Sequence, residues 1–125
     1  MLLLLLSLLP LLTTILATPI TAPTTALAAG DLLFCLGPNW DACSTVTPVR
    51  KNNTTTCNDL NARLPGWENM VSGLKTNGQE CMLYGQRRCK GKRYLVDGDV
   101  SQLPAEWDNQ VRSFLCGISG VLRTR

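Results

Sequence analysis

The sequence contains no histidine, and its first 29 residues carry no charged side chain. Without histidine, Ser-His-Asp and Cys-His catalysis, imidazole base chemistry and most zinc hydrolases are excluded. The six cysteines include no CxxC pair, so they do not form a typical zinc site. Carboxylate pairs such as Asp97 with Asp99 could serve a glycosidase, but no apolar pocket is evident that would raise one pKa. We therefore expect no enzymatic activity.

The uncharged N-terminal stretch predicts a secretory signal peptide over residues 1–28. Its leucine run, from Leu2 to Leu12, is interrupted twice and is shorter than the roughly 20 residues of a membrane span, which argues against an uncleaved anchor. The Ala-Leu-Ala triplet that ends at Ala28 is a cleavage site of the A-x-A type. Cleavage after Ala17 is the alternative, and it would leave a short leader rich in threonine and proline.

The remaining chain, residues 30–125, is long enough for one small domain. A domain of this size buries only about two-thirds of its unfolded surface, so its core alone gives marginal stability. Six cysteines in a secreted chain predict three disulfide bonds, each worth roughly 2–4 kcal/mol. The sequence alone does not choose among the possible pairings of Cys35, Cys43, Cys57, Cys81, Cys89 and Cys116.

Two stretches of the chain resemble one another. Leu64 to Leu74 reads LPGWENMVSGL, and Leu103 to Cys116 reads LPAEWDNQVRSFLC. When Trp67 is aligned with Trp107, Leu-Pro precedes each tryptophan, and an acidic residue, asparagine and valine follow at matching positions. Two pairs of cysteines that share an eight-residue spacing are a second indication of a repeat. Such self-similarity predicts two supersecondary units that close one core, with both tryptophans in it.

Short strand signals separated by turn residues predict an all-β sandwich. The Asn77-Gly78 dipeptide predicts a reversal between two Greek keys, at about residues 31–78 and 79–125. One helical turn is expected at Cys57–Leu64, capped by Asn58 or Asp59. The expected strands are Asp31–Cys35, Glu80–Tyr84, Lys92–Val96 and Val111–Cys116.

Asn52 and Asn53 begin two overlapping N-glycosylation sequons. They lie in a polar, threonine-rich stretch between Cys43 and Cys57. A glycan requires a surface position, which fits this composition, and a chance sequon in a threonine-rich loop is the alternative.

Three features of the second half resemble the βγ-crystallin Greek key. Tyr84 is followed by Gly91 in YGQRRCKG, as in the aromatic and glycine hairpin of that fold, where glycine takes a positive φ. Ser113 stands where the family has a serine that hydrogen-bonds the hairpin. The segment Asp108–Ser113, DNQVRS, is similar to the family's calcium arch. The first half departs from the pattern: Phe34 is followed by Asp41, and Gly73 replaces the serine.

Within that superfamily, the chain most resembles small secreted metalloproteinase inhibitors of bacterial type. The resemblance lies in the Cys81-Met82-Leu83-Tyr84 and Cys89-Lys90-Gly91 segments and in the tryptophan arches. The cysteine-rich, basic killer toxins of this fold are also similar. The resemblance implies inhibition of an extracellular peptidase, or else a membrane-active antimicrobial protein. A calcium-binding structural protein is the third possibility.

The calcium arches of the family imply candidate oxygen ligands, since Ca²⁺ takes six to eight oxygens. The fifth arch position supplies a hydroxyl in the family; the first arch keeps it as Ser72, whereas the second has Arg112, which repels Ca²⁺. We expect one site to be disabled and no cofactor to be required, with calcium as the candidate ion. The alternative is that Asp108 and Asn109 only turn the chain. The candidate ligands are Glu68, Asn69, Met70, Ser72, Asp108, Asn109 and Gln110.

Five cations lie within seven residues of the second hairpin. This cluster could meet an acidic peptidase surface, an anionic membrane or a polysaccharide, or it could be merely a solvated hairpin. Aromatic residues are too few among the cations to indicate nucleic acid. Trp40 has no repeat partner and lies among turn residues, so it joins the candidate contact surface. That surface consists of Arg87, Arg88, Lys90, Lys92, Arg93 and Trp40. We expect a secreted monomer.

Overall fold

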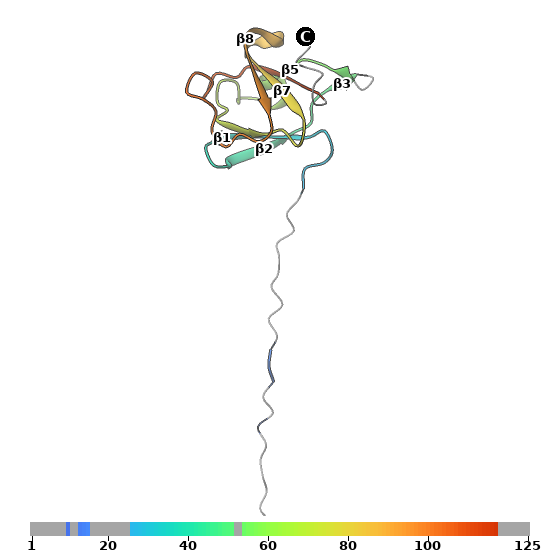
Figure 1. The fold of residues 1–125 in the computed structure, drawn as a ribbon, viewed down its shortest axis with the longest axis vertical. Coiled ribbons are helices and arrows are strands. Elements are labelled where there is room, and N and C mark those ends of the chain that lie inside the picture. The colour runs from blue at the N-terminus through green and yellow to red at the C-terminus, as the bar shows by residue number, and fades with distance from the viewer. Residues whose placement is uncertain (1–9, 11–12, 16–25, 52–53, 118–125) are drawn as a thin grey trace, which may run out of the picture.

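The computed structural model describes residues 10, 13–15, 26–51 and 54–117 of the chain (Figure 1). Most of the predicted signal peptide lies outside these residues, as do the sequon asparagines Asn52 and Asn53. Over these ranges, no helix combines the length and apolar character needed to cross a bilayer. The elements are β1 (Leu32–Gly37), β2 (Asp41–Val46), β3 (Arg50–Lys51), β4 (Thr54–Thr55), β5 (Asn58–Asp59), α1 (Leu60–Arg63), β6 (Gly73–Lys75), β7 (Glu80–Gln86), η1 (Arg87–Cys89), β8 (Lys90–Asp97) and β9 (Ser113–Gly117).

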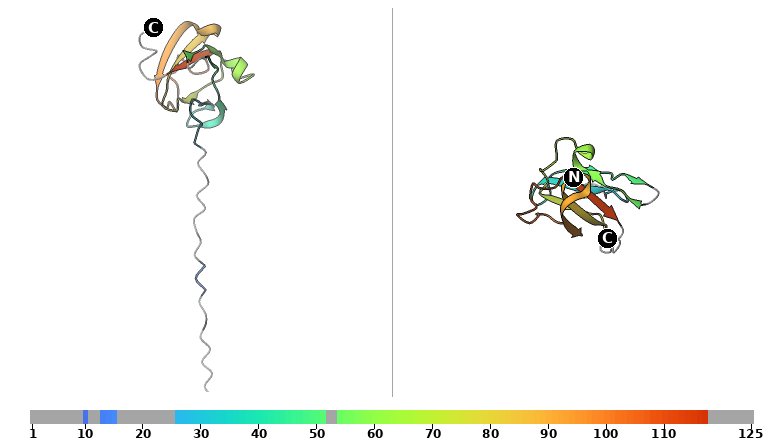
Figure 2. Two further views of the ribbon diagram at one scale, coloured as in Figure 1. Left: turned by 90° about the vertical axis from the view of Figure 1, so that its right-hand side faces the viewer. Right: turned by 90° about the horizontal axis from the view of Figure 1, so that it is seen from above.

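The strands form two antiparallel sheets and one separate hairpin. The first sheet has the order β2-β1-β6, and the second has the order β5-β9-β7-β8. The β3–β4 hairpin stands out from the body of the domain (Figure 1, Figure 2). The sequence pattern predicted β1, β7 and β8 closely. It missed β2 and the β3–β4 hairpin because their residues are mostly polar and show no apolar alternation.

The two halves of the chain exchange a strand. β5 belongs to the first half but pairs with β9, with Asn58 opposite Phe114. In return, Val100 of the second half forms a bridge to Leu74 on β6. This exchange interlocks two Greek keys into one all-β sandwich, which confirms the predicted fold class.

The core lies between the two sheets. Phe34 on β1 and Phe114 on β9 are fully buried, and their ring centroids are 5.0 Å apart. Trp107 is buried and stacks on Tyr94 at 5.7 Å, whereas Trp67 is only half-buried and packs on the edge of the core. The core prediction is therefore confirmed for Trp107 and in part for Trp67.

All six cysteines form disulfides, as predicted, and the pairs are Cys35–Cys43, Cys57–Cys89 and Cys81–Cys116. The equal spacing of Cys35–Cys43 and Cys81–Cys89 is consequently not a sign of the repeat, contrary to our expectation. The last two bonds tie parts of the chain 32 and 35 residues apart. Bonds that close such loops restrict the unfolded chain and stabilise the domain by roughly 2–4 kcal/mol each.

The folded hairpins of the two keys repeat at a spacing of 49 residues. Three left-handed positions with the same spacing mark each hairpin tip: Asn39, Trp40 and Ala42 in the first, and Arg88, Cys89 and Gly91 in the second. Cys35 lies opposite Gly73 on β6, just as Tyr84 lies opposite Ser113 on β9. The counterparts of Tyr84 and Gly91 are therefore Cys35 and Ala42. The sequence alignment with Phe34 and Asp41 was wrong by one residue.

The predicted helical turn is the short helix α1, which begins after Asp59. Leu64 closes it by donating its N–H to the Leu60 carbonyl at 2.7 Å, and Gly66 leaves it with a φ of 87°. Asp59 stands at the N-cap, but its side chain makes no cap hydrogen bond. The carboxylate points instead to the second hairpin, where it becomes part of the candidate site.

Candidate functional site

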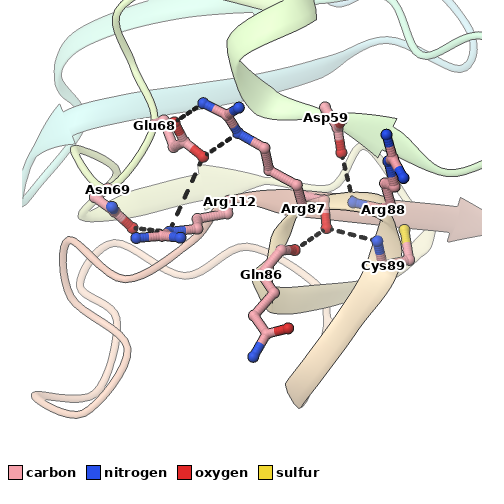
Figure 3. Close-up of polar contacts among 9 residues, drawn as sticks. Asp59, Glu68, Asn69, Gln86, Arg87, Arg88, Cys89 and Arg112 are labelled. Carbon is pink, nitrogen blue, oxygen red and sulfur yellow. Dashed lines mark hydrogen bonds and ion pairs between the residues drawn. The ribbon is translucent and has the colours of Figure 1, made fainter.

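Ser113 fixes the backbone of the second hairpin at the turn η1. Its hydroxyl donates to the Gln86 carbonyl at 2.5 Å and accepts the Cys89 N–H at 2.9 Å (Figure 3). One side chain on β9 thus holds both sides of the turn. Gly91 is needed beside it, because its φ is 79° and a Cβ there would lie 2.9 Å from Gln86 Cγ. The resemblance implied this role for Ser113, and the geometry agrees.

Three further contacts hold the same turn, and Figure 3 shows the two polar ones. The Asp59 carboxylate accepts the Arg88 N–H at 2.7 Å, and Cys89 is bonded to Cys57. The Arg87 guanidinium donates to both Glu68 carboxylate oxygens, at 2.8 and 2.7 Å. The backbone of Arg88 is therefore fixed on several sides, while its side chain is exposed to solvent.

The cations of the predicted basic surface fall into two groups, those whose side chains contact other residues and those that are exposed to solvent. Arg87 is engaged with Glu68. Lys92 donates to the Glu106 carbonyl at 2.8 Å, with its ammonium 4.7 Å from the Trp107 ring centroid. Arg88, Lys90 and Arg93 are exposed. Among the residues that the structure places, no carboxylate pairs with these three side chains, so they are the cations that the hairpin presents outward.

Trp40 lies at the tip of the first hairpin, at the position equivalent to Cys89. It is 37% exposed, and the Lys75 ammonium lies 4.6 Å from its ring centroid. The Asn39 N–H beside it donates to the Ser101 carbonyl at 3.1 Å. Trp40 and the basic turn are therefore at the tips of two different hairpins, on different sheets, and do not form one continuous cluster.

The side chains of Arg87 and Arg112 contact the first arch, where the resemblance suggested calcium ligands. Besides its bonds from Arg87, Glu68 lies 4.0 Å from Arg112 Nε, which also donates to Asn69 Oδ1 at 3.4 Å (Figure 3). The hydrogen bond from Arg87 is the main cause that lowers the pKa of Glu68, and the charges of both arginines add to it. Met70 is exposed. Guanidinium groups thus stand where a cation would bind, so the first arch does not fit Ca²⁺.

The second arch carries a carboxylate oxygen that lacks a partner. Asp108 Oδ1 is buried and accepts no hydrogen bond from any described residue. The Asn109 N–H donates at 3.0 Å to the carbonyl of Val71, next to the buried Ser72. Gln110 is exposed. Over the placed residues, no three His, Cys, Asp or Glu side chains gather as metal ligands, so Ca²⁺ here would need backbone and hydroxyl oxygens as well.

Some residues of this site carried no recognisable sequence signal. Asp59 looked like a helix cap, and Glu68 looked like a calcium ligand. Their role in holding the turn depends on contacts 29 and 19 residues away in the chain. No spacing rule predicts such pairs, because the tertiary packing of the two keys brings them together.

Two interlocked Greek keys with a serine-tied folded hairpin and paired arches define the βγ-crystallin fold. No protein-family model and no curated protein matches the sequence. Solved βγ-crystallin structures do match. A domain from Flavobacterium johnsoniae is 20% identical with a TM-score of 0.57, covering 74% of this chain and 98% of its own. At such identity the similarity shows the fold alone.

Two further structures agree with this assignment. The N-terminal domain of Protein S has 17% identity and a TM-score of 0.56, and the match covers 73% of this chain and 99% of that domain. A βγ-crystallin domain from Clostridium beijerinckii has 14% identity and the same TM-score, over 69% and 95% of the two chains. The chain therefore has the βγ-crystallin fold.

Proposed function

We propose that the protein is a secreted, non-enzymatic binding protein that inhibits an extracellular peptidase through the turn Arg87–Cys89. The supporting observation is that this turn is fixed by a serine, a carboxylate, an ion pair and a disulfide. A loop that is already ordered loses little conformational entropy when it docks, and this favours tight binding. The three disulfides indicate an oxidising compartment, in keeping with a secreted protein.

Arg88 is the anchor residue of this proposal. Its side chain is exposed, so it can enter an acidic recess on the peptidase. Its φ of 60° and ψ of 31° lie in the left-handed region, far from the extended angles of a segment that pairs as a strand. The turn would therefore block a peptidase by covering its cleft, not by lying in it as a substrate does.

A peptidase panel tests the proposal. The purified, disulfide-bonded protein is incubated at micromolar concentration with thermolysin-like and serine peptidases, with and without Ca²⁺. We expect dose-dependent loss of activity in at least one class of peptidase. Full activity of every peptidase in the panel would contradict the proposal.

Calcium stabilisation is a second candidate, favoured by the unpartnered Asp108 Oδ1. A bound Ca²⁺ would offset the cost of burying that oxygen and would stabilise the folded state by mass action. Millimolar Ca²⁺ should then raise the melting temperature of the native protein but not that of Ser72→Ala. An identical melt with Ca²⁺ and with chelator would remove this candidate.

A further inference from the structure

A groove beside the basic turn gathers cations from three separate elements. It has a volume of about 550 Å³. Arg50 and Lys51 come from β3, Arg63 from the last turn of α1 and Arg88 from η1. Only Arg88 belongs to the basic cluster that the sequence revealed. The rest of the lining is Val49, Thr56, Cys57, Asn58, Asp59 and Ala62.

The groove concentrates the positive charge of the protein. Four cations line it against one carboxylate, that of Asp59, which already accepts the Arg88 N–H. This excess of three equals the formal net charge of the whole chain, +3. In the sequence as a whole, the remaining basic and acidic residues cancel in formal charge, so an anionic ligand would be drawn to the groove.

Two of the four cations are held in place by contacts with the rest of the domain. The backbone of Arg88 is tied to Asp59 and to the Cys57–Cys89 disulfide. The Arg50 guanidinium donates to the Gln79 side chain, which positions it at one side of the groove. Arginine can bind a carboxylate or a sulfate through two parallel hydrogen bonds, so three arginines in one groove suit a ligand with repeated anionic groups.

The lining also argues against other polyanions. It contains no aromatic side chain, whereas single-stranded nucleic acids stack their bases on such residues. Its apolar members are small, and no deep apolar pocket is available for the anchor residue that a protein partner normally buries. A concave groove also offers a flat membrane few simultaneous contacts. We infer that this groove binds a linear anionic polysaccharide carrying carboxylate or sulfate groups.

Binding to heparin and to polygalacturonate, measured by calorimetry at low ionic strength with dextran as neutral control, tests this inference. The critical variant is Arg63→Glu, because the Arg63 side chain is exposed and forms no hydrogen bond or ion pair with the residues that the structure describes. Its matched control is Arg93→Glu, an exposed residue of β8 outside the groove with the same change in charge. We expect tenfold or greater loss of affinity in Arg63→Glu, less than threefold loss in Arg93→Glu, and weaker binding by the native protein as salt is added.

Three results would overturn the inference: no binding to either polyanion, equal losses in both variants, or binding confined to vesicles containing phosphatidylserine. Equal losses would mean that net charge alone attracts the ligand. The inference goes beyond peptidase inhibition and fails independently of it. Arg63→Glu should leave any inhibition of a peptidase unchanged, and a thermal melt of each variant verifies that it is folded.

Discussion

Asn69 and Asn109 make equivalent backbone hydrogen bonds, each donating its N–H to a valine carbonyl of the other arch. The Asn69 N–H donates to the Val111 carbonyl at 3.0 Å, and the Asn109 N–H donates to the Val71 carbonyl at 3.0 Å. Both asparagines have a left-handed backbone, with φ of 59° and 58°, a conformation that asparagine tolerates better than most residues. Each arch is therefore held by the other, so damage to one key should destabilise both.

Ser113→Ala should destabilise the whole domain. The hydroxyl makes two hydrogen bonds to the turn, and its loss leaves the Cys89 N–H without a partner, at a cost of about 1–3 kcal/mol. For a domain of this size each kcal/mol lowers the melting temperature by roughly 4–8 °C. Ser44→Ala on β2 is the control, since the Ser44 side chain makes no hydrogen bond to any described residue. Equal melting of the two variants would contradict the assigned role of Ser113.

Gly73→Ala should also destabilise the protein, although alanine is closer in size than glycine to Ser113, the equivalent residue of the second key. A Cβ at Gly73 would lie 2.9 Å from the Ser101 carbonyl oxygen and 3.0 Å from that of Val100. Both are backbone atoms of the segment that pairs with β6 through the Leu74–Val100 bridge. The clash can therefore be relieved only by a backbone shift, which costs roughly 1–3 kcal/mol. Urea unfolding measures this loss. An unchanged or raised midpoint would show that the two keys are packed less closely at this point than described.

The ion pair between Arg87 and Glu68 should make stability depend on pH. The pKa of Glu68 in the folded protein is lowered from about 4.5, so the pair stabilises the fold above that pH. The contribution is lost as the pH falls through the lower folded-state pKa. The difference in melting temperature between the native protein and Glu68→Gln should therefore be present at neutral pH and vanish in acid. A surface pair contributes little, and high salt should reduce the difference.

A difference between these proteins that persists unchanged at low pH would mean that the carboxylate charge is not responsible. Asn61→Asp is a useful comparison in the same melts. It adds a carboxyl group at an exposed position of α1.

The sequence predicted the fold because the tryptophan arches and the second hairpin carry local signals. Tryptophan, asparagine and valine recur at a spacing of 40 residues, with Leu-Pro before each tryptophan. Gly91 marks a turn that requires a left-handed backbone. The first hairpin was harder to align. Its left-handed positions hold Asn39, Trp40 and Ala42, which have no glycine among them, so the turn depends on tertiary packing.

The candidate site was predicted only in part. The cations of the second hairpin were evident as a run in the sequence. The contacts that engage Arg87 and Lys92 and leave the other three exposed were not evident. Arg112 could be recognised as unfavourable for calcium, whereas its contact with Asn69 depends on how the two arches interlock. Arg50 and Arg63 reach the groove through β3 and α1, and short polar elements of this kind carry no periodic signal.

The most direct test of the proposed function measures peptidase inhibition by the native protein, Arg88→Ala and Arg93→Ala in parallel. The substitution at Arg88 removes an exposed side chain and leaves its backbone N–H bonded to Asp59, so the three proteins should melt alike. We predict an inhibition constant at least tenfold weaker for Arg88→Ala and nearly unchanged for Arg93→Ala. Inhibition that is equally strong in all three proteins would show that the turn Arg87–Cys89 is not the contact surface.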